Sequence, residues 1–89
     1  MSYSVSLSHS AIKELKTLDK PIRKLILDAL DDVAALDDPR VRGKALTGPW
    51  GGYWRYRVGD YRIICEIRDH ELCILAVKIN HRSTIYKTR

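Results

Sequence analysis

The sequence predicts an α+β fold: a single domain with the element order β-α-α-β-β-β, in which two helices pack on one face of an antiparallel sheet. Three observations support this prediction. Residues 3–7 alternate between apolar and polar side chains, two segments between residues 8 and 38 carry apolar residues three and four positions apart, and three strand-like segments follow residue 52. A chain of 89 residues with 45% hydrophobic residues can build one core, so we expect residues 1–89 to form one domain.

The first half of the chain reads as one strand and two helices. Ser8 can cap a helix that runs to about Leu18 and carries Ile12, Leu15 and Leu18 on one face. Pro21 suits the first turn of a second helix, which Asp37-Asp38-Pro39 ends. The apolar residues of this second helix form one stripe: Ile22, Leu25, Ile26, Ala29, Leu30, Val33 and Leu36.

The second half reads as a loop and three strands. Residues 40–52 are rich in Gly and Pro, so we expect a loop with little regular structure there. Strands are predicted at residues 53–58, 61–68 and 72–79, with turns at Gly59-Asp60 and Asp69-His70. We expect residues 83–89 to form a short tail with room for one helical turn.

Several classes of protein are excluded by composition. The chain has no long apolar run and its first ten residues do not resemble a signal peptide, so we expect a cytoplasmic protein that does not enter a membrane. Cys65 and Cys73 lie in apolar segments and are expected to be buried and unbridged. No cluster of metal ligands is evident, and we expect no metal, no cofactor and no small-molecule ligand.

Positive charge is concentrated in the C-terminal part of the chain. Residues 1–38 contain five Lys or Arg and seven Asp or Glu, a net charge of −2, whereas residues 39–89 contain eleven and four, a net charge of +7. Eight of those eleven cations are Arg, whose guanidinium suits bidentate contacts with phosphate. A part of the chain with this much positive charge attracts polyanions, most often RNA or DNA. The alternative is a sheet edge that charge protects from aggregation.

Strand alternation predicts that three arginines share one surface. Arg55 and Arg57 lie on the same face of the strand at 53–58, opposite Trp54, Tyr56 and Val58. A core that contains Ile63, Cys65 and Ile67 leaves Arg62 on that same outer surface. Because guanidinium groups repel one another, such a cluster is costly unless an anion occupies it, although Glu66 could pair with one of them.

The segment after the last strand contains residues useful in phosphoryl transfer. Cutting RNA requires that the 2′-hydroxyl lose a proton, that the charge on the phosphate be stabilised, and that the leaving oxygen gain a proton. Arginine can bind the phosphate but is too basic to accept the proton. His81 can act as base or acid, and Tyr86 can stack on a base or donate its proton. A structural role is the alternative for a single histidine.

Three motifs together resemble the RelE/ParE toxin superfamily. They are Arg57-Val58-Gly59-Asp60-Tyr61-Arg62 before an apolar strand, His81-Arg82 with Tyr86 four residues later, and the upstream segment Lys44-Ala45-Leu46-Thr47-Gly48. Each motif alone is weak, but the ordered set in a chain of this length is specific, and the resemblance covers nearly the whole chain.

The resemblance implies a type II toxin that enters the ribosomal A site, cleaves mRNA without a metal, and is held inactive by a cognate antitoxin. The implied catalytic residues are Arg62, His81, Arg82 and Tyr86, and the implied phosphate- or RNA-binding residues are Lys44, Arg55, Arg57 and Lys78. Some family members have lysines at the positions of Arg55 and Arg57. In this chain the role of general base would therefore pass to His81, to Lys44 or Lys78, or to the surroundings of the substrate.

Two other functions remain open at this point. A ParE-like protein would inhibit DNA gyrase without cutting RNA, and it would share the same fold. The segment from His81 to Tyr86 resembles the RNA-cutting branch and favours the first hypothesis. The other function is that of a basic module that binds nucleic acid and is not toxic.

Overall fold

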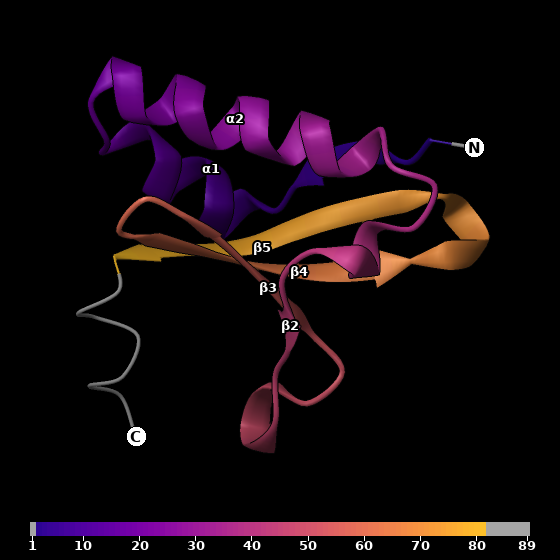
Figure 1. Ribbon diagram of the computed structural model, residues 1–89. Helices are drawn as coiled ribbons and strands as arrows, with labels where there is room; N and C mark the ends of the chain where they lie inside the picture. The colour runs from indigo at the N-terminus through magenta and orange to yellow at the C-terminus, as the bar shows by residue number, and fades with distance from the viewer. Residues whose placement is uncertain (1, 82–89) are drawn as a thin grey trace.

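The computed structural model describes residues 2–81 and shows two helices packed on one face of a five-stranded sheet (Figure 1). The helices are α1 (His9–Lys16) and α2 (Lys20–Ala34). The strands are β1 (Ser4–Leu7), β2 (Lys44–Ala45), β3 (Trp54–Val58), β4 (Tyr61–Arg68) and β5 (Cys73–His81). Three short 3₁₀ helices occupy Pro39–Val41, Gly48–Trp50 and Asp69–Glu71. The predicted α+β fold with both helices on one face is confirmed.

The sheet has the order β1-β5-β4-β3-β2 and differs from the prediction in two ways. First, β1 pairs with β5 in parallel, so the sheet is mixed rather than antiparallel. Second, the loop predicted at residues 40–52 contains β2, which pairs with β3 through Lys44 opposite Arg55 and Ala45 opposite Trp54. A two-residue strand is too short to show alternation, and the partner of β1 lies about 70 residues away, beyond the reach of any local pattern.

Both helices begin where the sequence predicts. The Ser8 side chain accepts a hydrogen bond from the Ala11 amide at 3.0 Å, and Pro21 lies in the first turn of α2. The buried stripes are narrower than predicted. Ile12 of α1 is exposed, as is Leu25 of α2 at 55%. The apolar face that the sheet covers is therefore smaller than the apolar face in the sequence.

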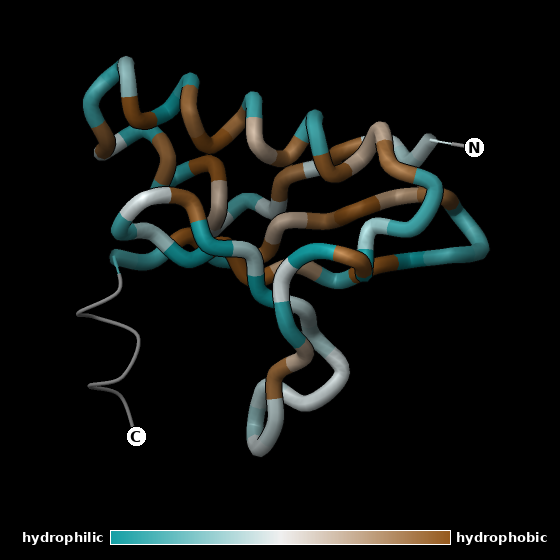
Figure 2. Tube along the Cα trace, in the orientation of Figure 1, coloured by the Kyte–Doolittle hydropathy of each residue, from teal (hydrophilic) through white to brown (hydrophobic). Residues whose placement is uncertain are grey.

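The core lies between the helices and the sheet. Hydrophobic and hydrophilic residues alternate along both helices, as expected for helices with one buried face (Figure 2). Its fully or nearly fully buried members include Ile26 and Leu30 from α2, Ile63 and Cys65 from β4, and Ile74 from β5. Burial raises the pKa of the Cys65 thiol to about 12. Cys65 and Cys73 are both buried and not bridged, as predicted.

The segment between α2 and β2 is fixed to the rest of the fold by side chains. The buried Tyr56 hydroxyl donates a hydrogen bond to the Pro39 carbonyl at 2.8 Å, and burial raises the pKa of this hydroxyl. The Arg40 guanidinium donates two hydrogen bonds, of 3.0 and 2.9 Å, to the Asp69 carboxylate in the β4–β5 turn. These contacts determine where the chain enters β2.

None of the helices in residues 2–81 combines the length and apolar character needed to cross a membrane.

Candidate functional site

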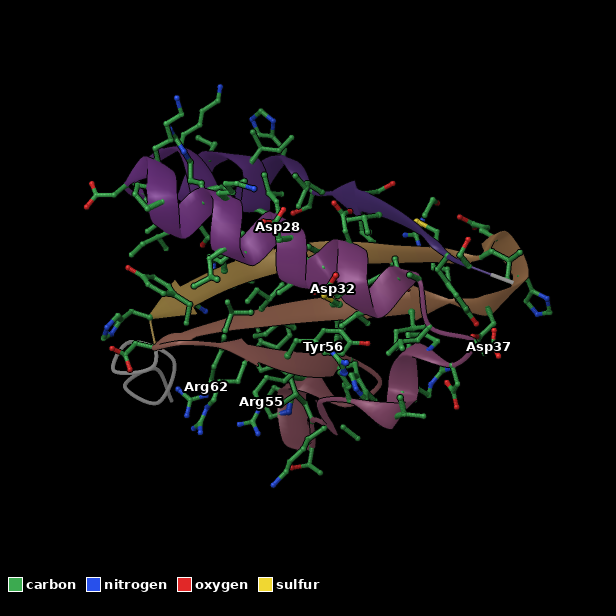
Figure 3. The ribbon with its side chains drawn as sticks, turned by 45° about the horizontal axis from the view of Figure 1, so that its top comes forward. Asp28, Asp32, Asp37, Arg55, Tyr56 and Arg62 are labelled. Carbon is green, nitrogen blue, oxygen red and sulfur yellow. The ribbon has the colours of Figure 1, made fainter. Side chains whose placement is uncertain are left out.

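The arginine-rich surface lies on the face of the sheet opposite the helices. In the β3–β4 hairpin Arg57 lies directly opposite Arg62, and Arg55 lies opposite Ile64. Figure 3 shows Arg55 and Arg62 on the side of the sheet away from α2, whereas Asp28 and Asp32 lie on α2. The inward neighbour Tyr56 is 4% exposed and belongs to the core, so the predicted alternation along β3 is confirmed. The structure therefore brings all three predicted arginines to one face.

An open depression of about 340 Å³ lies at the outer edge of this face. It is lined by Gly43, Lys44, Arg55 and Arg57. Lys44 and Arg55 are register partners, so their side chains leave the sheet on the same side. Three cationic side chains around an open volume of this size are suited to a phosphate group.

Arg62 and Glu66 are further charged groups on this face. Arg62 is 5% exposed, and charges interact more strongly where water is partly excluded. Glu66, which we considered as a partner for one of the three arginines, instead accepts a hydrogen bond from Arg68 at 3.1 Å. That hydrogen bond raises the pKa of Arg68. The Glu66 carboxylate is thus engaged at the far end of β4.

Gly43 and Trp54 position Lys44 beside the arginines. Gly43 has a φ of +78°, and a Cβ there would collide with the Arg55 carbonyl oxygen and lie 2.8 Å from the Trp54 Nε1. The Trp54 indole donates a hydrogen bond of 2.6 Å to the Arg42 carbonyl. The chain can therefore approach β3 this closely only with glycine at this position. This role was not predicted from the sequence, although a glycine directly before Lys44 of the motif was a usable signal.

Lys78 is held away from the depression. Its register partner is Ile64, which places its Cα on the arginine side of the sheet. Its ammonium group, however, bonds the Glu14 carboxylate of α1 at 3.0 Å, and the other oxygen of Glu14 accepts a hydrogen bond of 2.7 Å from the Ile79 amide. The predicted RNA-binding role of Lys78 would require that this ion pair open.

The strand register places His81 on the side of the sheet opposite the arginines. A bulge in β5 changes the pairing from Cys65 with Ala76 to Ile64 with Lys78, so Val77 is the additional residue. Beyond it His81 is paired with Tyr61, and the two rings meet edge-on with centroids 5.2 Å apart. Tyr61 packs against the core, so the structure does not bring His81 to the arginines.

Asn80 lies opposite Arg62 and was not among the site residues predicted from the sequence. Its side chain emerges on the arginine face because the bulge reverses the alternation of β5 after Val77. Arg82 and Tyr86, the remaining residues of the predicted site, lie outside the described residues.

The described part of the site can bind phosphate and stabilise negative charge that develops on it. Arg55, Arg57, Arg62 and Lys44 supply the positive charge. Arginine does not accept protons at neutral pH, so proton transfer requires other groups. The geometry thus gives this chain a cationic surface whose chemistry suits phosphate groups, and comparison with known proteins identifies its class.

A family model described as the ParE toxin of the type II toxin–antitoxin system parDE matches residues 5–86. The chain is 27% identical over 88 residues to toxin RelG of Mycobacterium tuberculosis, covering 98% of this chain and 99% of that protein. It is 33% identical over 78 residues to toxin RelE3 of Methanocaldococcus jannaschii, covering 84% and 85%. The protein therefore belongs to the RelE/ParE superfamily of type II toxins, as the motifs predicted.

Solved structures agree on the fold. The RelBE2 toxin–antitoxin complex of Mycobacterium tuberculosis matches with a TM-score of 0.84 at 24% identity, over 93% of this chain and 94% of that chain. The archaeal RelE–RelB complex of Pyrococcus horikoshii matches with a TM-score of 0.74 at 27% identity, over 94% and 99%.

Proposed function

We propose that this toxin is an endoribonuclease that cleaves mRNA in the ribosomal A site by attack of the 2′-hydroxyl on the adjacent phosphate. The observation that carries the proposal is the cross-strand pair Arg57 and Arg62, with Arg55 beside it and Lys44 across from Arg55. In this proposal these cations stabilise the negative charge that develops on the scissile phosphate, and such electrostatic stabilisation is the largest single contribution to catalysis in many enzymes.

In this proposal the arginines bind the phosphate and stabilise the transition state, and they do not transfer protons. The proton leaves the 2′-hydroxyl and another reaches the leaving 5′-oxygen, so one base and one acid are needed. We assign these roles to the motif formed by His81, Arg82 and Tyr86. Since His81 lies beside Tyr61, it takes part only if the end of β5 turns toward the arginines on the ribosome.

We further propose a cognate antitoxin as the partner that keeps the toxin inactive. The similar solved structures described above are toxin–antitoxin complexes, which supports this partner. An acidic or amphipathic peptide segment would complement a basic face of this kind. Ribosomes and mRNA would then be reached in the cytoplasm after the antitoxin is lost.

The second candidate function is inhibition of DNA gyrase, which a resemblance to the ParE branch implies, and the matching family model is described as a ParE toxin. The relatives compared by sequence have RelE-type names, which supports RNA cleavage. Primer extension on mRNA after induction, alongside a gyrase supercoiling assay with the purified toxin, distinguishes the two. New 5′ ends in mRNA with normal supercoiling are expected. Inhibited supercoiling with intact mRNA would replace the proposal by the gyrase function.

Variants test the site by growth after induction and by primer extension on mRNA. Arg62→Ala and Tyr86→Phe should relieve growth arrest, because the first removes a phosphate contact and the second a proton donor. Arg68→Ala is the matched control, since Arg68 lies on the same strand as Arg62 but pairs with Glu66. Full toxicity of both Arg62→Ala and Tyr86→Phe would show that the proposed site is wrong.

A further inference from the structure

The hairpin between β2 and β3 ends in a pair of aromatic residues outside the core. This hairpin projects away from the helices and the remaining strands (Figure 1). At its end the rings of Trp50 and Tyr53 meet edge-on, with centroids 5.4 Å apart and planes at 85°. Trp50 is 37% exposed, and neither ring is among the residues that pack against the hydrophobic core.

The hairpin end has a defined backbone structure. The Leu46 amide donates to the Tyr53 carbonyl and the Tyr53 amide donates to the Trp50 carbonyl, both at 3.1 Å. The Gly51 amide donates to the Gly48 carbonyl at 2.9 Å. These hydrogen bonds hold the two aromatic residues in a fixed relation to β3.

The aromatic pair continues the line of cations along β3. Arg55 and Arg57 share one face of β3 at an interval of about 7 Å, and Tyr53 lies just before this strand, where the hydrogen bond from the Leu46 amide continues the pairing of β2 with β3. The depression that Lys44, Arg55 and Arg57 line lies next to this hairpin. An aromatic surface directly adjoining a row of cations matches the chemistry of a single-stranded nucleotide chain, in which bases and phosphates are equally adjacent.

We propose that Trp50 and Tyr53 form a stacking surface for an unpaired base of the RNA strand whose phosphates Lys44, Arg55 and Arg57 bind. This inference rests on the proposed function and adds a base-binding subsite to it. Stacking of a base on an aromatic side chain does not depend on which base is present, so the subsite contributes affinity without strong sequence preference. The direct adjacency of the aromatic pair and the cationic depression matches the alternation of bases and phosphates, so we commit to RNA rather than a protein segment as the occupant.

The experiment measures binding of a fluorescently labelled ten-nucleotide 2′-O-methyl RNA, which cannot be cleaved by 2′-hydroxyl attack. Trp50→Ala should raise Kd by roughly five- to 150-fold, the range for loss of one stacked base. The salt dependence of binding should stay unchanged, because no phosphate contact is lost. Val41→Ala is the matched control: Val41 is 69% exposed and lies outside the hairpin, and its Kd should equal that of the wild type. A Kd for Trp50→Ala equal to that of the wild type overturns the inference.

Two further measurements separate this inference from the proposed function. With an abasic oligomer of the same length, wild type and Trp50→Ala should bind equally, and a persistent difference would show that Trp50 does not stack on a base. Arg57→Ala should lower the dependence of log Kd on log salt by about 0.7. If it does so while Trp50→Ala has no effect, the stacking surface fails and the cationic site stands. If Trp50→Ala weakens only inhibition by the cognate antitoxin, the hairpin end is a protein contact and the inference is wrong.

Discussion

The predicted site has two halves, one in the β3–β4 hairpin and one at the C-terminal end of β5. The strand pairing is regular in the first and interrupted by a bulge in the second. In the hairpin every residue from Trp54 to Val58 has a regular partner, and the alternation of the sequence places the arginines correctly. In β5 the bulge at Val77 shifts the register, so that Lys78 bonds Glu14 and His81 lies beside Tyr61. Alternation therefore predicts shared faces only as far as a ladder remains regular.

The bulge has a physical reason in the sequence itself. Ile74 and Ala76 face the core, so uninterrupted alternation would direct Lys78 into it. Burying an ammonium group among Ile and Leu side chains is strongly unfavourable. One additional residue brings Ile79 into the core instead, at 5% exposure, and Lys78 reaches the Glu14 carboxylate. The same shift moves His81 to the side of Tyr61.

The largest expected effect is on the rate of RNA cleavage, and it compares Arg62 of the β3–β4 hairpin with His81 at the end of β5. Arg62→Ala should reduce the rate of RNA cleavage about 100- to 1,000-fold, the usual loss when one group that stabilises transition-state charge is removed. His81→Ala should cause a loss of similar size if the end of β5 turns toward the arginines on the ribosome, as the proposed proton transfer requires; a loss below about threefold would remove His81 from that step and leave the ring beside Tyr61. The measurement is single-turnover cleavage of mRNA on programmed ribosomes. Equal losses for the two variants would mean that the end of β5 rearranges when the toxin binds, and the contrast between the two halves would then apply only to the free protein.

The second-largest expected effect tests whether the stability of the fold depends on the close approach of β2 to β3 at Gly43. Gly43→Ala should lower the free energy of unfolding by about 2–4 kcal/mol, because it combines a left-handed backbone with collisions against β3. Gly59→Ala is the matched control. Gly59 has a φ of +59° but has no atom within 4 Å of the added Cβ, so it should lose only about 1–2 kcal/mol. Urea unfolding followed by circular dichroism gives both values, and equal losses would contradict the packing argument.

The sequence predicts the parts of this fold that depend on local chemistry. The Ser8 cap, Pro21 in the first turn of α2 and the Gly59-Asp60 turn all lie where the residues indicate. The parallel pairing of β1 with β5 depends on how distant segments meet, and no local pattern contains it. Leu25 belongs to the helical stripe but remains exposed, because the sheet covers only part of that stripe.

The residues of the candidate site also divide into those that local patterns place and those that distant contacts place. The arginines of the hairpin could be placed because one turn and one alternation relate them. The positions of Lys78 and His81 depend on a bulge, and the partner of Lys78 belongs to a helix 64 residues earlier in the chain. Regular alternation after Ile74 and Ala76 calls for an apolar residue at position 78, but the sequence has Lys78 there and the apolar Ile79 one position later. This displacement is the signal that could have indicated the bulge.

A smaller effect tests what stabilises the bulged end of β5. Glu14→Ala should lower the free energy of unfolding by about 1–3 kcal/mol, because it leaves the Ile79 amide without its acceptor. Glu14→Gln keeps an acceptor oxygen for that amide and should recover part of the loss. Asp28→Ala removes an exposed ion pair with Lys24 and serves as the control, with a loss below about 0.5 kcal/mol. Thermal unfolding of the three variants measures this order, and a loss for Glu14→Ala no greater than the control would contradict the assigned role.

The smallest expected effect is a pH dependence at the opposite end of the same strands, in the β4–β5 turn. Hydrogen bonds from Arg40, and then from Tyr3, hold the pKa of Asp69 below its usual value. A carboxyl group whose pKa is lower in the folded than in the unfolded protein stabilises the fold above the unfolded value, about 3.9, and this stabilisation is lost as pH falls through the folded pKa. Wild type should therefore be more stable than Asp69→Asn at pH 6, and the difference should shrink as the pH falls below about 4. Urea midpoints between pH 2.5 and 6 measure it. A difference that stays constant over this range would show that the ionised form of Asp69 does not stabilise the contact between Arg40 and the turn.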